Sequence, residues 1–188
     1  HLKRWESRKF AQVADRLAVE HQAQIILVGD SEERPVVEQV KQAMREGFTD
    51  LTGRTTLPQL FALLAKSRMV ITNDSACLHA AQAMGSPTVA IFGPTDERKY
   101  GPRWPNSVVV RRPLVCAPCE RALCPYNHEC MRWLEVEEVY EAAMRILVKE
   151  GKEALALLTD FMETGGDAQV FAYDCIDVVR RSLSAAIG

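Results

Sequence analysis

The stretch of residues 69–95 constrains the fold of this chain most, because apolar, capping and small residues alternate in it at short intervals. The apolar run that opens it is too short for a helix and predicts a strand. The next residues, 72–75, are Thr-Asn-Asp-Ser, types that cap helices by accepting hydrogen bonds from unpaired amides, so a helix is expected to start near Asp74. A glycine and a proline then stop that helix, and the β-branched run at 89–92 predicts a second strand. This order of elements forms a βαβ unit, in which the two strands are parallel neighbours.

Polar side chains gather where this unit can bind a ligand. Both strands end at the edge of the sheet where the helix begins, and the free amides and positive dipole of the helix form an anion site there. His79 lies four residues after Ser75 and leans back toward the helix N-terminus. Asp74, Ser75, His79 and Thr95 are therefore predicted to converge on one ligand. The alternative is structural: Asp74 or Asn73 only caps the helix, and His79 is an interior histidine with satisfied hydrogen bonds.

The rest of the chain continues the alternation of helices and strands. Helices are expected at about 10–19, 35–45, 57–67, 139–147, 152–162 and 170–186, and strands at 24–28, 49–51 and 107–112. This pattern predicts an α/β fold with a Rossmann-like parallel sheet and flanking helices, whose ligands bind outside the carboxyl ends of the strands. The motif Gly-x-Gly-x-x-Gly is missing from the sequence, so a dinucleotide dehydrogenase is a poor fit.

Composition agrees with an ordinary soluble globular protein of one domain, or one domain plus an appendage. Of the 188 residues, 47% are hydrophobic and 26% are charged. A net charge of -2 and a pI near 6.1 give no general attraction to nucleic acid. No apolar run approaches the ~20 residues that span a bilayer, and no signal peptide is visible. The chain begins with His1 rather than Met, which suggests a piece of a longer protein.

A cluster of cysteines follows the last expected strand of the sheet. Cys116, Cys119, Cys124 and Cys130 lie close together in the sequence, with His128 among them. In a reducing compartment such a cluster binds metal more often than it forms disulfides, because tetrahedral zinc accepts four sulfur ligands, or three and a histidine. The spacing differs from that of a standard zinc ribbon. Two interpretations stay open: a structural metal site, or free or partly oxidised thiols.

Three linked pieces stand in a characteristic order: Asn73-Asp74-Ser75 with His79, then Gly85 and Pro87, then Phe92-Gly93-Pro94-Thr95. This series resembles the nucleotide-sugar-binding signature of glycosyltransferase family 9, the ADP-heptose:lipopolysaccharide heptosyltransferases. One position departs from it, since many members carry glycine where this chain has Ala76. A methyl group there limits how closely the backbone approaches a phosphate.

Two further pieces resemble the same family. Lys3-Arg4-Trp5 is similar to its Lys-x-Trp segment, whose lysine contacts the donor diphosphate. Gly29 and Glu33 are similar to its Gly-(three residues)-Glu turn, whose carboxylate contacts the nucleoside part of the donor. Without the resemblance, Lys3 reads as a solvated terminal residue, and Glu33 as an acidic first-turn residue favoured by the helix dipole.

The resemblance implies the C-terminal half of a GT-B fold. Residues 1–150 would form the nucleotide-sugar-binding Rossmann-like domain, with a Cys-rich loop at 116–130, and residues 151–188 a helical extension. The implied reaction is inverting transfer of a heptose from an ADP-sugar to a lipopolysaccharide core acceptor, in the cytoplasm and with a peripheral position at the inner membrane face as one option. The implied donor-binding residues are Lys3, Glu33, Asp74, Ser75, Ala76, His79 and Thr95.

The catalytic general base is expected in an N-terminal acceptor-binding domain outside this chain, so no catalytic residue is assigned here. No cofactor is required, because a lysine and a helix N-terminus can stabilise the departing diphosphate; a structural zinc ion stays one of the two interpretations of the cysteines. Two other functions stay open. One is a metal-stabilised, non-catalytic interaction module, and the other is a related nucleotide-sugar epimerase or hydrolase, which would need a second catalytic carboxylate in the cleft.

Overall fold

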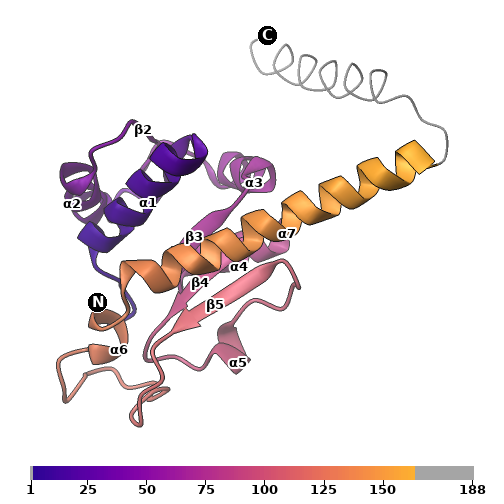
Figure 1. The fold of residues 1–188 in the computed structure, drawn as a ribbon. Helices are drawn as coiled ribbons and strands as arrows, with labels where there is room; N and C mark the ends of the chain where they lie inside the picture. The colour runs from indigo at the N-terminus through magenta and orange to yellow at the C-terminus, as the bar shows by residue number, and fades with distance from the viewer. Residues whose placement is uncertain (1, 164–188) are drawn as a thin grey trace. The chain divides into compact units, whose positions relative to one another are not determined.

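The computed structural model describes residues 2–163 and divides the chain into two compact units, the first ending at Ile146 and the second starting at Leu147. Helices and strands alternate as expected (Figure 1). The helices are α1 Ser7–His21, α2 Arg34–Ala43, α3 Leu57–Lys66, α4 Ala76–Ala83, α5 Glu97–Tyr100, α6 Glu129–Arg132 and α7 Val136–Glu163. The strands are β1 Ile25–Leu27, β2 Phe48–Asp50, β3 Val70–Asn73, β4 Thr88–Phe92 and β5 Ser107–Arg111.

The described strands pair in parallel, which confirms the predicted sheet type. β1 pairs with β2, and β3, β4 and β5 pair in that order. Asn73 at the end of β3 lies opposite Ile91 of β4, and Phe92 lies opposite Arg111 of β5. Because the strands within each group are parallel, their carboxyl ends lie at the same edge of that group.

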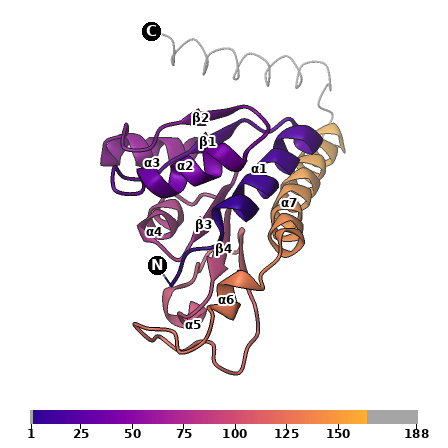
Figure 2. The same ribbon diagram turned by 90° about the vertical axis from the view of Figure 1, so that its left-hand side faces the viewer.

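The first unit is layered around β4, whose five residues are all buried. In Figure 2, α4 lies on one face of β3 and β4, while α1 and the beginning of α7 lie on the other. A continuous β-branched run requires cover on both faces, because both faces of a central parallel strand are apolar. Leu78 of α4 packs against Phe92, and fully burying a side chain of this size contributes about 1.5–3 kcal/mol.

Local signals set the ends of the central helices. The Thr56 amide donates to the Gln59 side chain at 2.9 Å, as part of a capping box at the start of α3. Gly85 has a φ of +71°, a conformation that side chains disfavour, and it ends α4 as predicted.

The C-terminal helices differ from the prediction. A break was expected between a helix at 139–147 and another at 152–162, but α7 runs without interruption over Val136–Glu163. A glycine in a helix interior costs about 1 kcal/mol relative to alanine and does not by itself end the helix, and no proline interrupts this segment. The short helices α5 and α6 were not expected. The helix expected at 170–186 lies outside the described residues.

The N-terminal segment is held in place by Trp5, which is 1% exposed. Its indole Nε1 donates to the Leu134 carbonyl at 2.9 Å, and its backbone amide donates to Asn73 Oδ1 at 3.0 Å. These two bonds join the segment before α1 to the start of α7 and to the end of β3. As a result, Lys3 lies over the carboxyl edge of the sheet.

Within residues 2–163, the helices lack the combination of length and apolarity that crossing a bilayer requires.

Candidate functional site

A buried carboxylate lies at the carboxyl edge of the sheet. Asp74 directly follows β3, and its amide donates to the Ile91 carbonyl at 3.1 Å. Its side chain is only 4% exposed. The Thr95 hydroxyl, which follows β4, donates to Asp74 Oδ2 at 2.7 Å. The βαβ geometry therefore brings Asp74 and Thr95 together, as the sequence predicts.

Lys3 completes this group. Its ammonium lies 2.7 Å from the same Asp74 Oδ2, and its side chain is 37% exposed. A buried carboxylate requires such a partner, because an unpaired charge away from water is strongly destabilising. The alternative interpretation of Lys3 as a solvated terminal residue is wrong. Because more than a third of its side chain still faces solvent, Lys3 remains accessible to a ligand at this edge.

Helix α4 begins beside this group without a side-chain cap. Ser75 is the N-cap residue, yet its side chain makes no capping bond. Its hydroxyl lies 3.2 Å from that of Thr72 instead. Asn73 and Asp74 do not cap the helix either, since Asn73 accepts from Trp5 and Asp74 from Lys3 and Thr95. The first-turn amides and the positive end of the dipole are thus placed to bind an anion.

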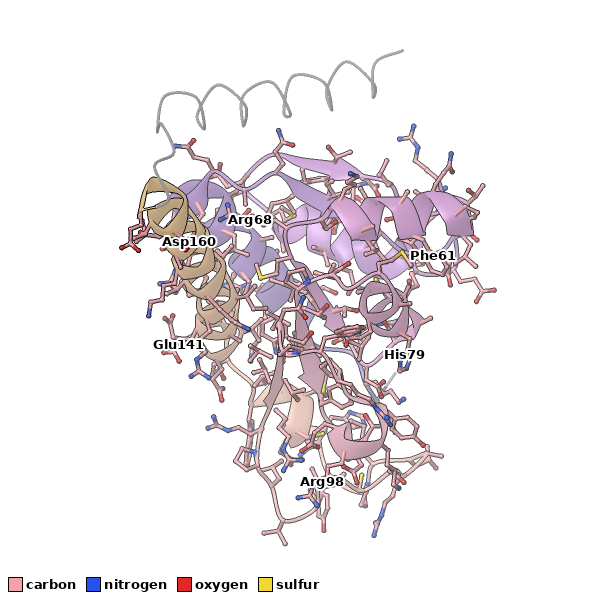
Figure 3. All side chains as sticks on the ribbon, turned by 90° about the vertical axis from the view of Figure 1, so that its right-hand side faces the viewer. Phe61, Arg68, His79, Arg98, Glu141 and Asp160 are labelled. Carbon is pink, nitrogen blue, oxygen red and sulfur yellow. The ribbon has the colours of Figure 1, made fainter. Side chains whose placement is uncertain are left out.

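Two of the expected ligand-binding residues stand apart from the hydrogen-bonded group. Ala76, the first residue of α4, is exposed and presents its methyl group at the helix N-terminus. His79 is also exposed, so the alternative of an interior histidine is wrong, and Figure 3 shows it at the surface beside α4. In the described part of the chain, no hydrogen bond or ion pair joins His79 to Asp74, Ser75 or Thr95.

A second group lies after β1, at the turn into α2. Asp30 Oδ1 accepts from the amides of Glu32 and Glu33 at 2.8 and 2.9 Å, which tightens the turn. Glu33 folds back over Gly29, where an added Cβ would lie 2.9 Å from Glu33 Oε2. The Gly53 amide, after β2, donates to the Gly29 carbonyl at 2.8 Å. Glu33 therefore presents a half-buried carboxylate above the ends of β1 and β2.

The negative charge of Glu33 in this turn acts on a thiol of α4. Burial raises the pKa of the Cys77 thiol in the first turn of α4, a hydrogen bond with Thr72 lowers it, and the negative charge of Glu33 raises it further. Glu33 thus lies within electrostatic range of α4. The first unit thus offers two kinds of binding group. The Lys3 ammonium and the N-terminus of α4 suit a phosphate, and the Glu33 carboxylate suits a sugar hydroxyl.

Tyr100 also lies beside Lys3, although no sequence pattern indicated it. Lys3 Nζ lies 5.9 Å from the centre of its ring, within range of a cation–π contact. Tyr100 ends α5, whose N-cap Asp96 accepts from the Arg98 amide at 2.9 Å. A capping aspartate before a short polar run was the available signal, but a single turn of helix is too short to give apolar periodicity.

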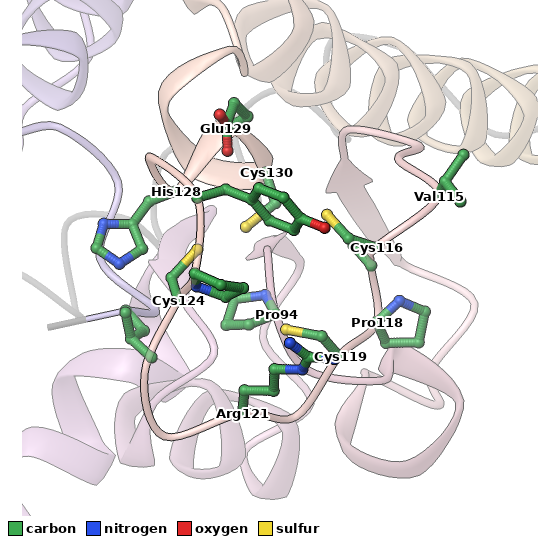
Figure 4. Close-up of a pocket in the computed structure, with 14 residues that line it drawn as sticks. Pro94, Val115, Cys116, Pro118, Cys119, Arg121, Cys124, His128, Glu129 and Cys130 are labelled. Carbon is green, nitrogen blue, oxygen red and sulfur yellow. The ribbon is translucent and has the colours of Figure 1, made fainter.

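The four cysteines expected to bind metal line one cavity of about 260 Å³ (Figure 4). Burial raises the pKa of the Cys130 thiol, and the nearby thiols of Cys119, Cys124 and Cys116 raise it further. The thiols of Cys119, Cys124 and Cys116 therefore lie within electrostatic range of Cys130. In residues 2–163, however, no group of three or more His, Cys, Asp or Glu side chains is already placed to hold a metal ion. The metal role of the cysteines stays a prediction.

Comparison with known proteins agrees with this fold. The model of "Glycosyltransferase family 9 (heptosyltransferase)" matches residues 1–129. A lipooligosaccharide heptosyltransferase 2 of Campylobacter jejuni is 34% identical over 151 residues, which cover 77% of this chain and 47% of that protein. The chain thus spans about half the length of this curated relative.

Solved structures give the same result. The glycosyl transferase family 9 from Veillonella parvula superposes with a TM-score of 0.72 at 26% identity, over 79% of this chain and 43% of that one. The E. coli ADP-heptose LPS heptosyltransferase II superposes with a TM-score of 0.67 at 24% identity, over 80% and 44%. The Rossmann-like α/β fold of GT-B type is thereby confirmed. This chain belongs to glycosyltransferase family 9, the heptosyltransferase family.

Proposed function

We propose that this chain is the donor-binding part of an inverting glycosyltransferase, which moves a heptose from an ADP-sugar to a lipopolysaccharide core acceptor. Family membership supports the reaction class. The observation that carries the proposal for this chain is the group formed by Lys3, Asp74 and Thr95 beside the uncapped N-terminus of α4.

The proposed chemistry follows from where charge develops. As the anomeric bond breaks, negative charge builds on the departing diphosphate, and the Lys3 ammonium and the α4 amides would stabilise it. Asp74 would bind no phosphate, because both are negative; it would hold Lys3 and Thr95 in place. The Glu33 carboxylate would accept hydrogen bonds from hydroxyls of the nucleoside. Ser75 and His79 would contact the donor from α4, where Ala76 limits how close a phosphate can approach.

The remaining parts of the reaction are assigned outside this chain. The general base that deprotonates the acceptor would belong to an N-terminal acceptor-binding domain, with the lipopolysaccharide acceptor at the inner face of the membrane. This chain alone would bind the donor and transfer little or no sugar. Its positive groups would replace a catalytic divalent cation, so the proposed reaction requires no cofactor.

Calorimetric titration with ADP, UDP and GDP tests the proposal. We expect selective ADP binding that Lys3→Met weakens about tenfold or more, since hydrogen bonds to charged groups contribute about 1.5–3 kcal/mol. Lys99→Met is the matched control, because the exposed Lys99 of α5 is also paired with a carboxylate, that of Glu120. It should leave the affinity unchanged.

Two results would contradict the proposal. One is no preference among the three nucleotides, and the other is equal weakening by Lys3→Met and Lys99→Met. If a folded chain bound no nucleotide at all, the interaction-module interpretation would gain support instead.

A further inference from the structure

The cysteine cavity draws its four thiols from a long connection and the helix after it. Cys116, Cys119 and Cys124 lie between β5 and α6, and Cys130 lies in α6. Cys116 is exposed, Cys119 and Cys124 are partly buried, and Cys130 is buried. Figure 4 shows all four sulfur atoms turned toward the same space, while the ring of His128 is turned away from them.

Polar contacts hold the connection between β5 and α6, but its large apolar side chains contribute little packing. Residues 112–128, all of them described, form neither helix nor strand, and loops longer than about 12–15 residues are uncommon unless they have a function or a crosslink. Val115, Leu123 and Tyr126 are large apolar residues, yet they are exposed rather than packed. The ordering of this segment therefore needs a source other than a hydrophobic core.

The connection nevertheless meets the sheet at a defined point. The amides of Cys119 and Glu120 both donate to the Pro94 carbonyl, at 2.9 and 2.8 Å. Gly93, just after β4, leaves room for the fourth cysteine, Cys130. A Cβ added at Gly93 would lie 3.3 Å from Cys130 Sγ. The thiols thus surround the end of β4 from two directions.

We propose that Cys116, Cys119, Cys124 and Cys130 bind one zinc ion that fixes residues 112–128 against the carboxyl end of β4. Zinc accepts four thiolates in a tetrahedron, and two cysteines separated by two residues can bind the same ion. Thiolates are soft ligands that select zinc over magnesium or calcium. Four thiolates carry two more negative charges than one zinc ion neutralises. Arg121 lines the same cavity, and its positive charge offsets part of this excess.

One ion explains the arrangement better than two disulfides do. Disulfides would need two separate pairs, whereas four sulfur atoms face one space. Because no three of these described side chains are already placed to hold an ion, binding has to draw the thiols together. The ion is therefore expected to order the connection and to stabilise the fold.

The test measures metal in the full chain, purified under reducing conditions without a metal-affinity tag. Mass spectrometry of the elements is expected to give one zinc per chain. Cobalt exchanged for zinc is expected to give the thiolate charge-transfer and tetrahedral absorption bands of a four-sulfur site. Chelation is expected to lower the melting temperature, and added zinc to restore it.

Variants locate the site. Cys116→Ser and Cys124→Ser are each expected to weaken zinc binding by about tenfold or more, because even loss of an outer-shell partner costs about 10–100-fold. Cys77→Ser is the matched control, since Cys77 lies in α4 outside this cavity, and it should keep the metal. A folded, reduced chain without zinc or cobalt bands would overturn the proposal. So would two disulfides in the freshly purified chain, or zinc retained by the Cys116→Ser and Cys124→Ser double variant.

Discussion

Asp74 is a carboxylate whose partners come from distant parts of the chain. Lys3 lies 71 residues before it and Thr95 lies 21 residues after it. The βαβ pattern was enough to predict that Asp74 and Thr95 meet, because strand ends in a parallel sheet share an edge. No local pattern places Lys3 there; only the resemblance to the family implied it, since the contact depends on how Trp5 is buried.

Gly93 gives a prediction at this scale. A Cβ there would lie 2.3 Å from Met131 Sδ and 2.8 Å from its Cγ, and Met131 is only 2% exposed, so it has little room to move. Gly93→Ala is expected to lower the free energy of unfolding by about 1–3 kcal/mol, as overpacking of a core does. Urea unfolding measures this. Gly47→Ala is the control, because an added Cβ there meets nothing within 4 Å; equal effects of both substitutions would contradict the packing described.

Asp50 gives a pH dependence. Hydrogen bonds from Thr52 and the Lys41 ammonium lower its pKa from 3.8 to about 2. A carboxyl group whose pKa is lower in the folded state than in the unfolded state stabilises the fold at pH values above the unfolded-state pKa. This contribution is lost as the pH falls through the folded-state pKa. The difference in free energy of unfolding between wild type and Asp50→Asn should therefore be constant above about pH 4 and shrink toward pH 2. Urea unfolding at several pH values measures it, and a difference that stays unchanged across this window would be inconsistent with the pairing.

Among the elements, those with apolar periodicity and clear caps were predictable. α3 begins after its capping residue Thr56 and α4 ends before Gly85, because capping acts within one turn. α5 and α6 were missed, since one turn carries no period. The continuous α7 was missed for a different reason: a break was expected between residues 147 and 152, but the single glycine there weakens the helix without ending it.

The contact between α1 and α7 can be tested by one hydroxyl. Tyr140 of α7 donates to Glu20 of α1 and lies 3.0 Å from His21 Nε2. Tyr140→Phe is expected to lower the free energy of unfolding by about 0.5–1.5 kcal/mol, the usual net contribution of a hydrogen bond. Tyr126→Phe on the exposed connection is the control and should have no measurable effect on urea unfolding. If Tyr140→Phe were equally neutral, the hydroxyl would add nothing to the helix pair.

For the whole molecule, the sequence was sufficient for the parallel α/β class but not for how its strands are grouped. Strand pattern alone does not say which neighbours pair, and the described ladders form two groups, β1 with β2 and β3 with β4 and β5. Glu33, which follows β1, is nevertheless close enough to α4 for its negative charge to raise the pKa of Cys77. We propose that the carboxyl edge around Lys3, Asp74 and Thr95 binds an ADP-sugar.

Amide chemical shifts of the isotope-labelled chain, recorded while ADP is added, show where the nucleotide binds. We expect the largest changes on the amides near Lys3, Glu33, Asp74 and Thr95 and in the first turn of α4. Changes confined to the cysteine cavity or spread evenly over the chain would contradict a donor site at the carboxyl edge of the sheet.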